Sequence, residues 1–222
     1  MNFDIRPCSM LDVFRLCKEH HGYGGAGKVA VYAWGVYEED IMVAAYAWQP
    51  PPPGAAKAVC PEAPGGVLAL SRMVAVPRER RRLKHVSKPL RVQMKNLIDR
   101  GRWPVLVTYS DRGQGHTGYV YQCSGWSKTA TSERVTLTDA AGTRVSSYSA
   151  GAHVTRLGCA KGRTTLDRWE SWACDRGMAD AWMRECGWIL VPVPGRSWKS
   201  GNPAYTWVQM PARTRAVNSL KK

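Results

Sequence analysis

The apolar run LALSRMVAV (Leu68–Val76) opens the central part of the chain, residues 68–109, and its length and composition predict a buried strand. Ser87 then follows as a helix N-cap, and Gly101 ends the predicted helix. Apolar residues recur along this helix at the helical period: Leu90, Met94, Leu97 and Ile98. VLVTY (Val105–Tyr109) is a second buried strand. The order strand, helix, strand predicts two parallel strands joined by a right-handed crossover.

Further strands and helices are expected on both sides of this unit. Before it, we expect a helix from Ser9 to about His21, an antiparallel hairpin of strands 29–37 and 41–48, and a Pro-rich loop over 50–64. After it, we expect a hairpin over 133–149, helices over 165–176 and 178–186, and strands over 188–193 and 205–210. This mixture predicts an α/β (α+β) fold, a single domain over residues 1–222 with a mixed central sheet and flanking helices.

The charge of the chain points to a polyanionic partner. Among 222 residues, 32 Lys and Arg stand against 17 Asp and Glu, which gives a net charge of +15. Such an excess favours nucleic acid as the partner. The chain has no apolar run near the roughly 20 residues that cross a bilayer, and its first residues do not resemble a signal peptide. We therefore expect no membrane partner and a cytoplasmic location, with the seven cysteines reduced.

The densest group of cations lies at the predicted anion-binding end of the central unit. The segment PRERRRLKH (Pro77–His85) follows the first strand and precedes the helix N-terminus. Its basic residues are Arg78, Arg80, Arg81, Arg82 and Lys84. This position suits phosphate binding, although a charge run can also be only a solvated surface. The segment Gly24–Lys28 does not fit a phosphate loop, because a strand rather than a helix follows it.

The second parallel strand leads into the segment richest in proton-transfer groups, YSDRGQGHTGYVYQCSGW (Tyr109–Trp126). Ligands of open sheets bind at the carboxyl ends of strands, so a polar cluster there is a candidate active site. The candidate catalytic residues are Tyr109, Asp111, His116, Tyr121 and Ser124. The alternative is a turn followed by an amphipathic strand.

A metal site is conceivable at His20 and His21, with Tyr23 and Cys17 nearby. Imidazole combined with phenol and carboxylate would suit iron. Paired histidines at a helix end also act as capping or surface groups, so both interpretations stay open.

The strings LSRMVAV, SKPL and VLVTYSDRGQGHTGYVYQCSGW together resemble the Mom family of bacteriophage DNA-modification proteins. The resemblance covers most of the chain, with a variable region, a hairpin insertion, over about 129–163 and a basic tail over about 211–222. It implies a fold like that of the GNAT acetyltransferases. It also implies conversion of adenine in DNA to N6-carbamoylmethyladenine, which shields phage DNA from restriction in the host cytoplasm.

One departure from the acetyltransferases concerns the donor. Those enzymes hold the coenzyme A pyrophosphate on a Gly-containing loop before the helix, and the corresponding stretch, Arg78–Ser87, has no glycine. The carbamoylmethyl group also contains a nitrogen that acetyl cannot supply. We therefore expect glycyl-tRNA as donor, with acetyl-CoA as the alternative. Asp111 is the candidate base, His116 the alternative base, and Tyr121 or Ser124 could donate to an oxyanion.

The substrate implied by the resemblance is double-stranded DNA, whose adenine must leave the helix to react. Trp126 could stack on that base. Other candidate contacts to nucleic acid are Arg72, Ser87, Arg100, Arg102 and Tyr148. Two alternatives stay open: a coenzyme A-dependent acetyltransferase, and a DNA-binding protein without chemistry. The sequence is compatible with more than one oligomeric state, a dimer among them.

Overall fold

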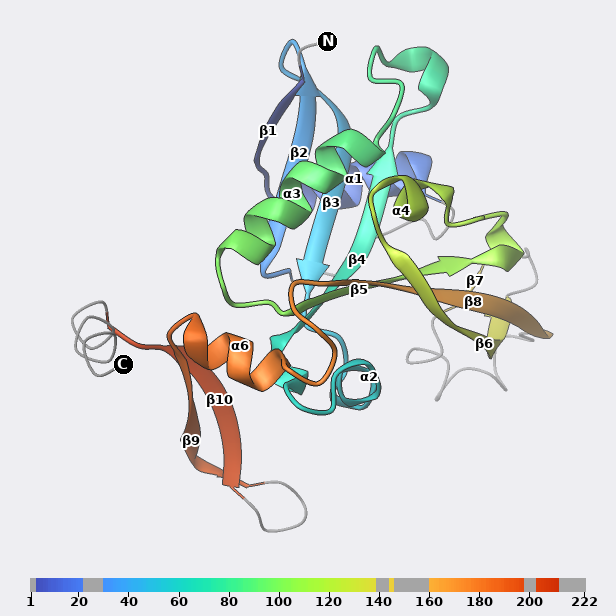
Figure 1. The fold of residues 1–222 in the computed structure, drawn as a ribbon. Helices are drawn as coiled ribbons and strands as arrows, with labels where there is room; N and C mark the ends of the chain where they lie inside the picture. Colours follow the sequence, from blue (N-terminus) through green and yellow to red (C-terminus); the bar gives the residue numbers. More distant parts are fainter. Residues whose placement is uncertain (1–2, 22–29, 139–143, 146–159, 198–202, 212–222) are drawn as a thin grey trace. The chain divides into compact units, whose positions relative to one another are not determined.

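The computed structural model describes residues 3–21, 30–138, 144–145, 160–197 and 203–211 (Figure 1). Contacts divide the chain into two compact units. The first comprises Met1–Gln49, Leu70–Arg91 and Val107–Ser171, and the second comprises Pro50–Ala69, Val92–Leu106 and Trp172–Lys222. Each unit is assembled from segments that are distant in sequence. No helix in the described ranges is long and apolar enough to cross a membrane.

Within the described residues, eight strands form one mixed sheet in the order β1-β2-β3-β4-β5-β8-β6-β7. The strands are β1 (Asp4–Pro7), β2 (Tyr32–Glu38), β3 (Ile41–Gln49), β4 (Val67–Ala75), β5 (Val105–Asp111), β6 (Ser127–Thr138), β7 (Arg144–Val145) and β8 (Ala160–Trp172). At its centre, β4 and β5 are neighbours, and α3 (Ser87–Asp99) connects them along the chain (Figure 1). This confirms the predicted strand–helix–strand unit and the mixed α/β fold.

The predicted first helix and hairpin are also present. Helix α1 (Met10–His20) begins after Ser9, whose hydroxyl accepts a hydrogen bond from the Asp12 amide at 3.1 Å. The Asp12 side chain accepts one from the Ser9 amide at 3.3 Å, which completes a capping box. Strands β2 and β3 pair antiparallel about a turn in which Glu39 and Asp40 have φ of 49° and 69°. Two positive φ angles are the geometry that a tight hairpin requires.

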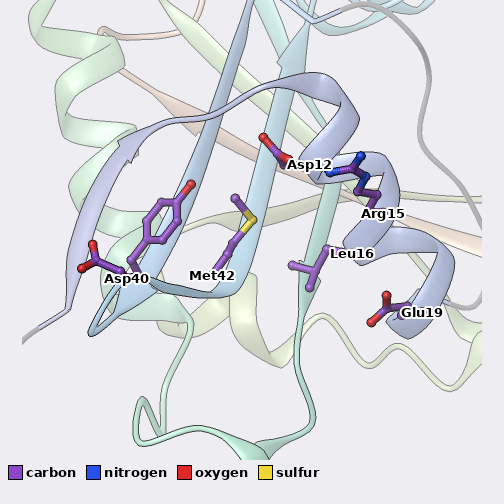
Figure 2. A pocket seen from close by; sticks show the side chains of 7 residues that line it. Asp12, Arg15, Leu16, Glu19, Asp40 and Met42 are labelled. Atoms are coloured by element: carbon purple, nitrogen blue, oxygen red, sulfur yellow. Dashed lines mark ion pairs between the residues drawn. The ribbon is translucent and has the colours of Figure 1, made fainter.

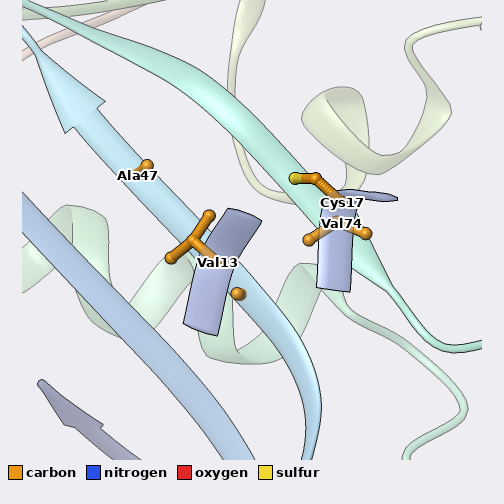
Figure 3. Packing of buried hydrophobic residues seen from close by; sticks show 5 residues of the cluster. Val13, Cys17, Ala47 and Val74 are labelled. Carbon is orange, nitrogen blue, oxygen red and sulfur yellow. The ribbon is translucent and has the colours of Figure 1, made fainter. Parts of the chain in front are cut away.

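One face of the sheet packs against α1, and we call it the α1 face. Val13 and Cys17 of α1 are fully buried against Ala45 and Ala47 of β3 and Val74 of β4 (Figure 3). Spaced by two in β3, the two alanines share this face. The small alanine side chains leave room for the helix to lie close to the strand.

The other face holds larger side chains. We call it the α4 face, because Tyr121 of α4 (Tyr119–Cys123) packs against Trp126, whose ring in turn stacks on Trp48 of β3. Tyr46 and Trp48, which alternate with the alanines along β3, are fully buried. The Tyr46 hydroxyl donates a hydrogen bond to the Val86 carbonyl at 2.7 Å, just before α3. The Trp48 ring is stacked on Trp126, with 6.3 Å between the ring centroids. Aromatic side chains therefore fill this side of the first unit.

Three local predictions were wrong. Residues 165–176 are not a helix, because β8 extends to Trp172 and pairs with β6 from Ser127↔Glu170 to Thr138↔Ala160. The side chains of TTLDRW fit a helical period, but they can also alternate between the two faces of a sheet. The hydrogen bonds of the long ladder with β6 favour the strand. The Pro-rich segment 50–64 contains α2 (Pro53–Val59) and the start of a 3-10 turn, η1 (Pro64–Gly66). The alternative of an amphipathic strand after the Asp111 turn is also incorrect, because the short helix α4 follows instead.

The second unit contains α2, η1, α6 (Ala179–Glu185), and strands β9 (Trp188–Ser197) and β10 (Pro203–Gln209). The two strands pair antiparallel, which confirms the predicted strands at the end of the chain. Gly101, at φ 66°, ends α3 as predicted. The guanidinium of Arg102 lies over the rings of Trp103 and Trp188, at 4.4 and 4.8 Å from their centroids.

Candidate active site

Asp111 lies at the end of β5, where the strand turns into a 3-10 turn, η3 (Arg112–Gln114). Its side chain caps this turn by accepting a hydrogen bond from the Gly113 amide at 2.9 Å. The Thr164 hydroxyl of β8 donates to the same carboxylate oxygen. Only 4% of the Asp111 surface is exposed. These two hydrogen bonds fix the orientation of the carboxylate.

His21, Arg72 and His116 come together on the α1 face. Arg72 lies two residues before Val74, on the side of β4 that faces α1, and its charge acts on Cys17 of that helix. His21 follows the end of α1. Its pKa is lowered to about 4, first by burial and then by electrostatic interactions with Arg72 and His116. The His21 imidazole is therefore neutral at pH 7.

Asp111 belongs to the same face. The Ser110 hydroxyl accepts a hydrogen bond from the Trp169 indole, and the Trp169 ring lies against Tyr121 on the α4 face. Because side chains alternate along a strand, Asp111 is placed on the opposite, α1 face. The His116 amide also donates to the Asp111 carbonyl at 3.2 Å. A buried carboxylate, a neutral imidazole and a guanidinium thus line one side of the sheet at the end of β5.

Tyr121, Ser124 and Trp126 are placed on the α4 face. Tyr121 is buried, and burial raises the pKa of its phenol, while its hydroxyl is hydrogen-bonded to Thr108 of β5. Its ring centroid lies 6.0 Å from that of Trp126 and 6.1 Å from that of Trp169. The Ser124 hydroxyl lies 2.7 Å from the Val120 carbonyl and 3.3 Å from the Ser87 carbonyl, both acceptors. The structure therefore does not bring the five predicted catalytic residues together on one face.

Several residues that shape this region were not predicted from the sequence. Thr164 holds Asp111, and Trp169 donates a hydrogen bond to the Ser110 hydroxyl at 2.9 Å. Asp167 is buried and receives two hydrogen bonds from Arg112, at 2.7 and 2.9 Å, which lower its pKa. Thr164, Asp167 and Trp169 all lie in β8. The period-two alternation of TTLDRW would have predicted them if the segment had been treated as a strand.

Two of the five basic residues in the predicted anion-binding segment are already bound to other groups of the protein. The Arg81 guanidinium donates to the Val76 carbonyl at 2.8 Å and to the Leu83 carbonyl. Arg82 forms an ion pair with Glu39. The remaining three are exposed, and the structure shows no ion pair for any of them in its described part: Arg78, Arg80 and Lys84. These three are available to an external polyanion.

The other predicted contacts are spread over the chain. Tyr109 and Ser87 are half-buried, and His116 and Arg100 are exposed. Arg102 is held between two tryptophans of the second unit. Trp126 is buried with its ring already stacked on Trp48. Tyr148, the Gly24–Lys28 segment, most of the variable region and nearly all of the basic tail lie outside the described residues.

The described residues around His20 and His21 do not fit an iron site, and Tyr23 lies outside the described ranges. Among the described residues, no group of three or more His, Cys, Asp or Glu side chains is placed to hold a metal ion. His20 lies 3.6 Å from the Glu19 carboxylate, whereas His21 faces Arg72. A guanidinium beside the imidazole repels a metal cation.

Two cavities lie in the first unit, on the side of β1 and α1. One, of about 350 Å³, is lined by Asp12, Arg15, Leu16, Glu19, Tyr37, Asp40 and Met42 (Figure 2). The second, of about 760 Å³, is lined by residues of the first two strands and the loop after β4, including Glu38, Glu39, Arg82 and Leu83. Neither lining contains Asp111, His21 or Tyr121.

Comparison with known proteins decides the family. The model of the Mom protein family matches residues 2–171. The chain belongs to the Mom family. No curated protein matches it in sequence.

Solved structures show the fold of this Mom family member. The ribosomal-protein-S18-alanine N-acetyltransferase of Escherichia coli superposes with a TM-score of 0.51 at 10% identity, covering 79% of this chain and 97% of that one. An N-acetyltransferase from Staphylococcus aureus Mu50 gives 0.49 at 13% identity, covering 78% and 100%. A Salmonella typhimurium protein solved with its cofactor acetyl-CoA gives 0.49 at 10%, covering 81% and 98%. The first of these superpositions shows that the Mom chain has the GNAT acetyltransferase fold.

This fold implies coenzyme A, and the loop that would receive it does not fit. In this Mom chain the loop between β4 and α3 contains no glycine from Arg78 to Ser87. Its amides at Arg82 and Leu83 donate to the carboxylate of Glu38. An incoming pyrophosphate would meet amides that are already bonded and a negative charge beside them.

Proposed function

We propose that the protein is a transferase that modifies adenine in phage DNA to N6-carbamoylmethyladenine, in the host cytoplasm, and so protects that DNA from restriction. The match to the Mom family over residues 2–171 carries this proposal. The GNAT fold supports group transfer to an amine. The exposed Arg78, Arg80 and Lys84 support a polyanionic substrate.

The first step transfers glycine from its ester on tRNA to the N6 amine of adenine. N6 attacks the ester carbonyl, the C–O bond breaks, and the tRNA ribose hydroxyl leaves with the proton that N6 loses. Asp111 first accepts this proton from N6 and then passes it to the leaving ribose oxygen, while Gly113 and Thr164 hold its carboxylate in place. His116, exposed on the same side, is the alternative base.

The second step rearranges the glycyl amide without a further reactant. The free amine of the glycyl group attacks C6 of the purine and closes a five-membered spiro ring. The bond from C6 to the original N6 then breaks, and N6 takes the proton that the attacking amine releases. N6 becomes the carboxamide nitrogen, so the glycyl and carbamoylmethyl adducts are isomers.

The test is the mass of deoxynucleosides from the DNA of bacteria that express the protein. We expect a fraction of deoxyadenosine to be heavier by one glycyl residue. Asp111→Asn should lower that fraction about 100-fold, because a positioned base contributes about 10²- to 10⁴-fold. The control is Asp175→Asn, which removes an exposed carboxylate. Unmodified deoxyadenosine with the wild type would refute the proposed activity, and full modification with a folded Asp111→Asn would remove the proposed base.

Acetyl-CoA is the alternative donor, favoured by the acetyltransferase fold. It would leave deoxyadenosine heavier by an acetyl group, which lacks the nitrogen of glycine. The same mass measurement therefore separates the two donors.

A further inference from the structure

The loop between β4 and α3 encloses a carboxylate that belongs to the protein itself. Glu38, at the end of β2, accepts a hydrogen bond from the Arg82 amide at 2.9 Å with one oxygen. Its other oxygen accepts from the amide of Leu83. Two successive backbone amides directed at one anion are the arrangement that proteins use to hold phosphate groups. Here the anion comes from a neighbouring strand.

The loop is fixed in this form from three sides. Leu83 anchors it with a side chain that is 1% exposed. Arg81 bridges its two ends through the carbonyls of Val76 and Leu83, and the charge of Glu38 acts on the same guanidinium. Arg82 pairs with Glu39 on the outside. The loop therefore does not have to rearrange to keep Glu38 bound.

We propose that Glu38 is a specificity-determining residue, which occupies the pyrophosphate position and excludes coenzyme A as donor. A tethered carboxylate is present at high effective concentration, so a diffusing pyrophosphate competes poorly with it. The neighbouring cavity of about 760 Å³ is lined by two arginines, Arg6 and Arg82, and both are already paired with carboxylates of the same lining. An incoming pyrophosphate would have to compete with those carboxylates for either cation. The inference deepens the proposed function, because a glycyl ester on tRNA carries no pyrophosphate and is not rejected by this contact.

The test measures coenzyme A binding by titration calorimetry, without DNA or tRNA. Wild-type protein should bind coenzyme A more weakly than about 1 mM, and Glu38→Ala should bind it at least about 10-fold more tightly. The matched control is Glu39→Ala, which removes the same charge from the same turn; the Glu39 carboxylate pairs with the Arg82 side chain and not with the loop amides that hold Glu38. It should behave like the wild type.

Three results would overturn the inference: micromolar binding by the wild type, no gain in a folded Glu38→Ala, or an equal gain in Glu39→Ala. Thermal melting shows whether the variants fold. If Glu38→Ala does not fold, Glu38→Gln replaces it, because its amide oxygen still accepts one hydrogen bond while the charge is lost. A folded Glu38→Gln should bind coenzyme A more tightly than Glu39→Ala, and equal binding would refute the inference. The proposed activity is judged separately, by the mass of DNA nucleosides.

Discussion

Ser110 and Asp111 follow one another at the end of β5, and their side chains have partners on opposite faces of the sheet. Ser110 accepts a hydrogen bond from Trp169, and Asp111 accepts one from Thr164. Strand alternation therefore separates the proton-handling groups near Asp111 from the buried phenol of Tyr121. At the residue scale, His21 is the member of the α1 face whose titration reports most directly on this arrangement.

We expect NMR titration of the imidazole resonances to give His21 a pKa of about 4, and Arg72→Gln to raise it, because burial then acts without the nearby cation. Above about pH 6.5, the usual pKa of an unfolded histidine, His21 is neutral in both the folded and the unfolded chain. Its titration therefore does not change the free energy of unfolding there. As the pH falls from about 6.5 to about 4, the unfolded chain binds a proton that folded His21 refuses, so its contribution to stability declines. A wild-type His21 that titrates near 6.5 would contradict the proposed cluster.

At the scale of elements, α4 is positioned by a glycine that touches a β8 tryptophan. Gly118 precedes α4 with φ of 75°, and a β-carbon there would lie 2.2 Å from the Trp169 ring. Gly115 has a similar φ, 72°, with nothing within 4 Å of its β-carbon position. A substitution at Gly115 therefore tests backbone strain alone, whereas the same substitution at Gly118 adds a steric clash with Trp169.

We expect Gly115→Ala to lower the free energy of unfolding by about 1 kcal/mol, the cost of a left-handed residue. Gly118→Ala should lower it by a further ~1–3 kcal/mol, because the added methyl group overpacks the aromatic cluster. Urea unfolding measures both. Equal losses for the two variants would show that Trp169 does not hold α4 in this way.

The sequence allowed the central unit to be predicted because its strands are continuous apolar runs and α3 has a clear helical period. Helix α1 was predictable from its Ser9 cap. The 165–176 segment failed because TTLDRW satisfies two periods, and only pairing with β6 decides between them. The site was predicted in part: Asp111 and His116 lie at the end of β5, but the approach of His21 to Arg72 depends on how α1 packs on the sheet. Glu38 could not be foreseen, because its partners are 44 and 45 residues away.

At the scale of the whole molecule, the charge of +15 has to be assigned to a surface. Arg78, Arg80 and Lys84 are exposed, whereas Arg81 is engaged with backbone carbonyls. In duplex DNA binding, the logarithm of the association constant falls linearly with the logarithm of the salt concentration, by about 0.9 for each phosphate contact. When Arg78, Arg80 and Lys84 are all changed to serine, we expect this slope to become smaller in magnitude by about 2.7. The control, Lys18, Lys57 and Lys95 changed to serine, removes the same charge elsewhere. Equal slopes for the two triple variants, measured by fluorescence anisotropy, would show that the loop is not the contact surface.

The atoms of the added group show whether glycine or acetate supplied it. One culture of bacteria that express the protein is fed glycine labelled with ¹³C at both carbons and ¹⁵N at the amine. A second culture is fed acetate labelled with ¹³C at both carbons. The mass of the modified deoxyadenosine is then measured by mass spectrometry. We expect both carbons and the nitrogen of glycine to enter the nucleoside together, and the nitrogen to stay on the base after the carboxamide is hydrolysed. Label entering from acetate and not from glycine would contradict it.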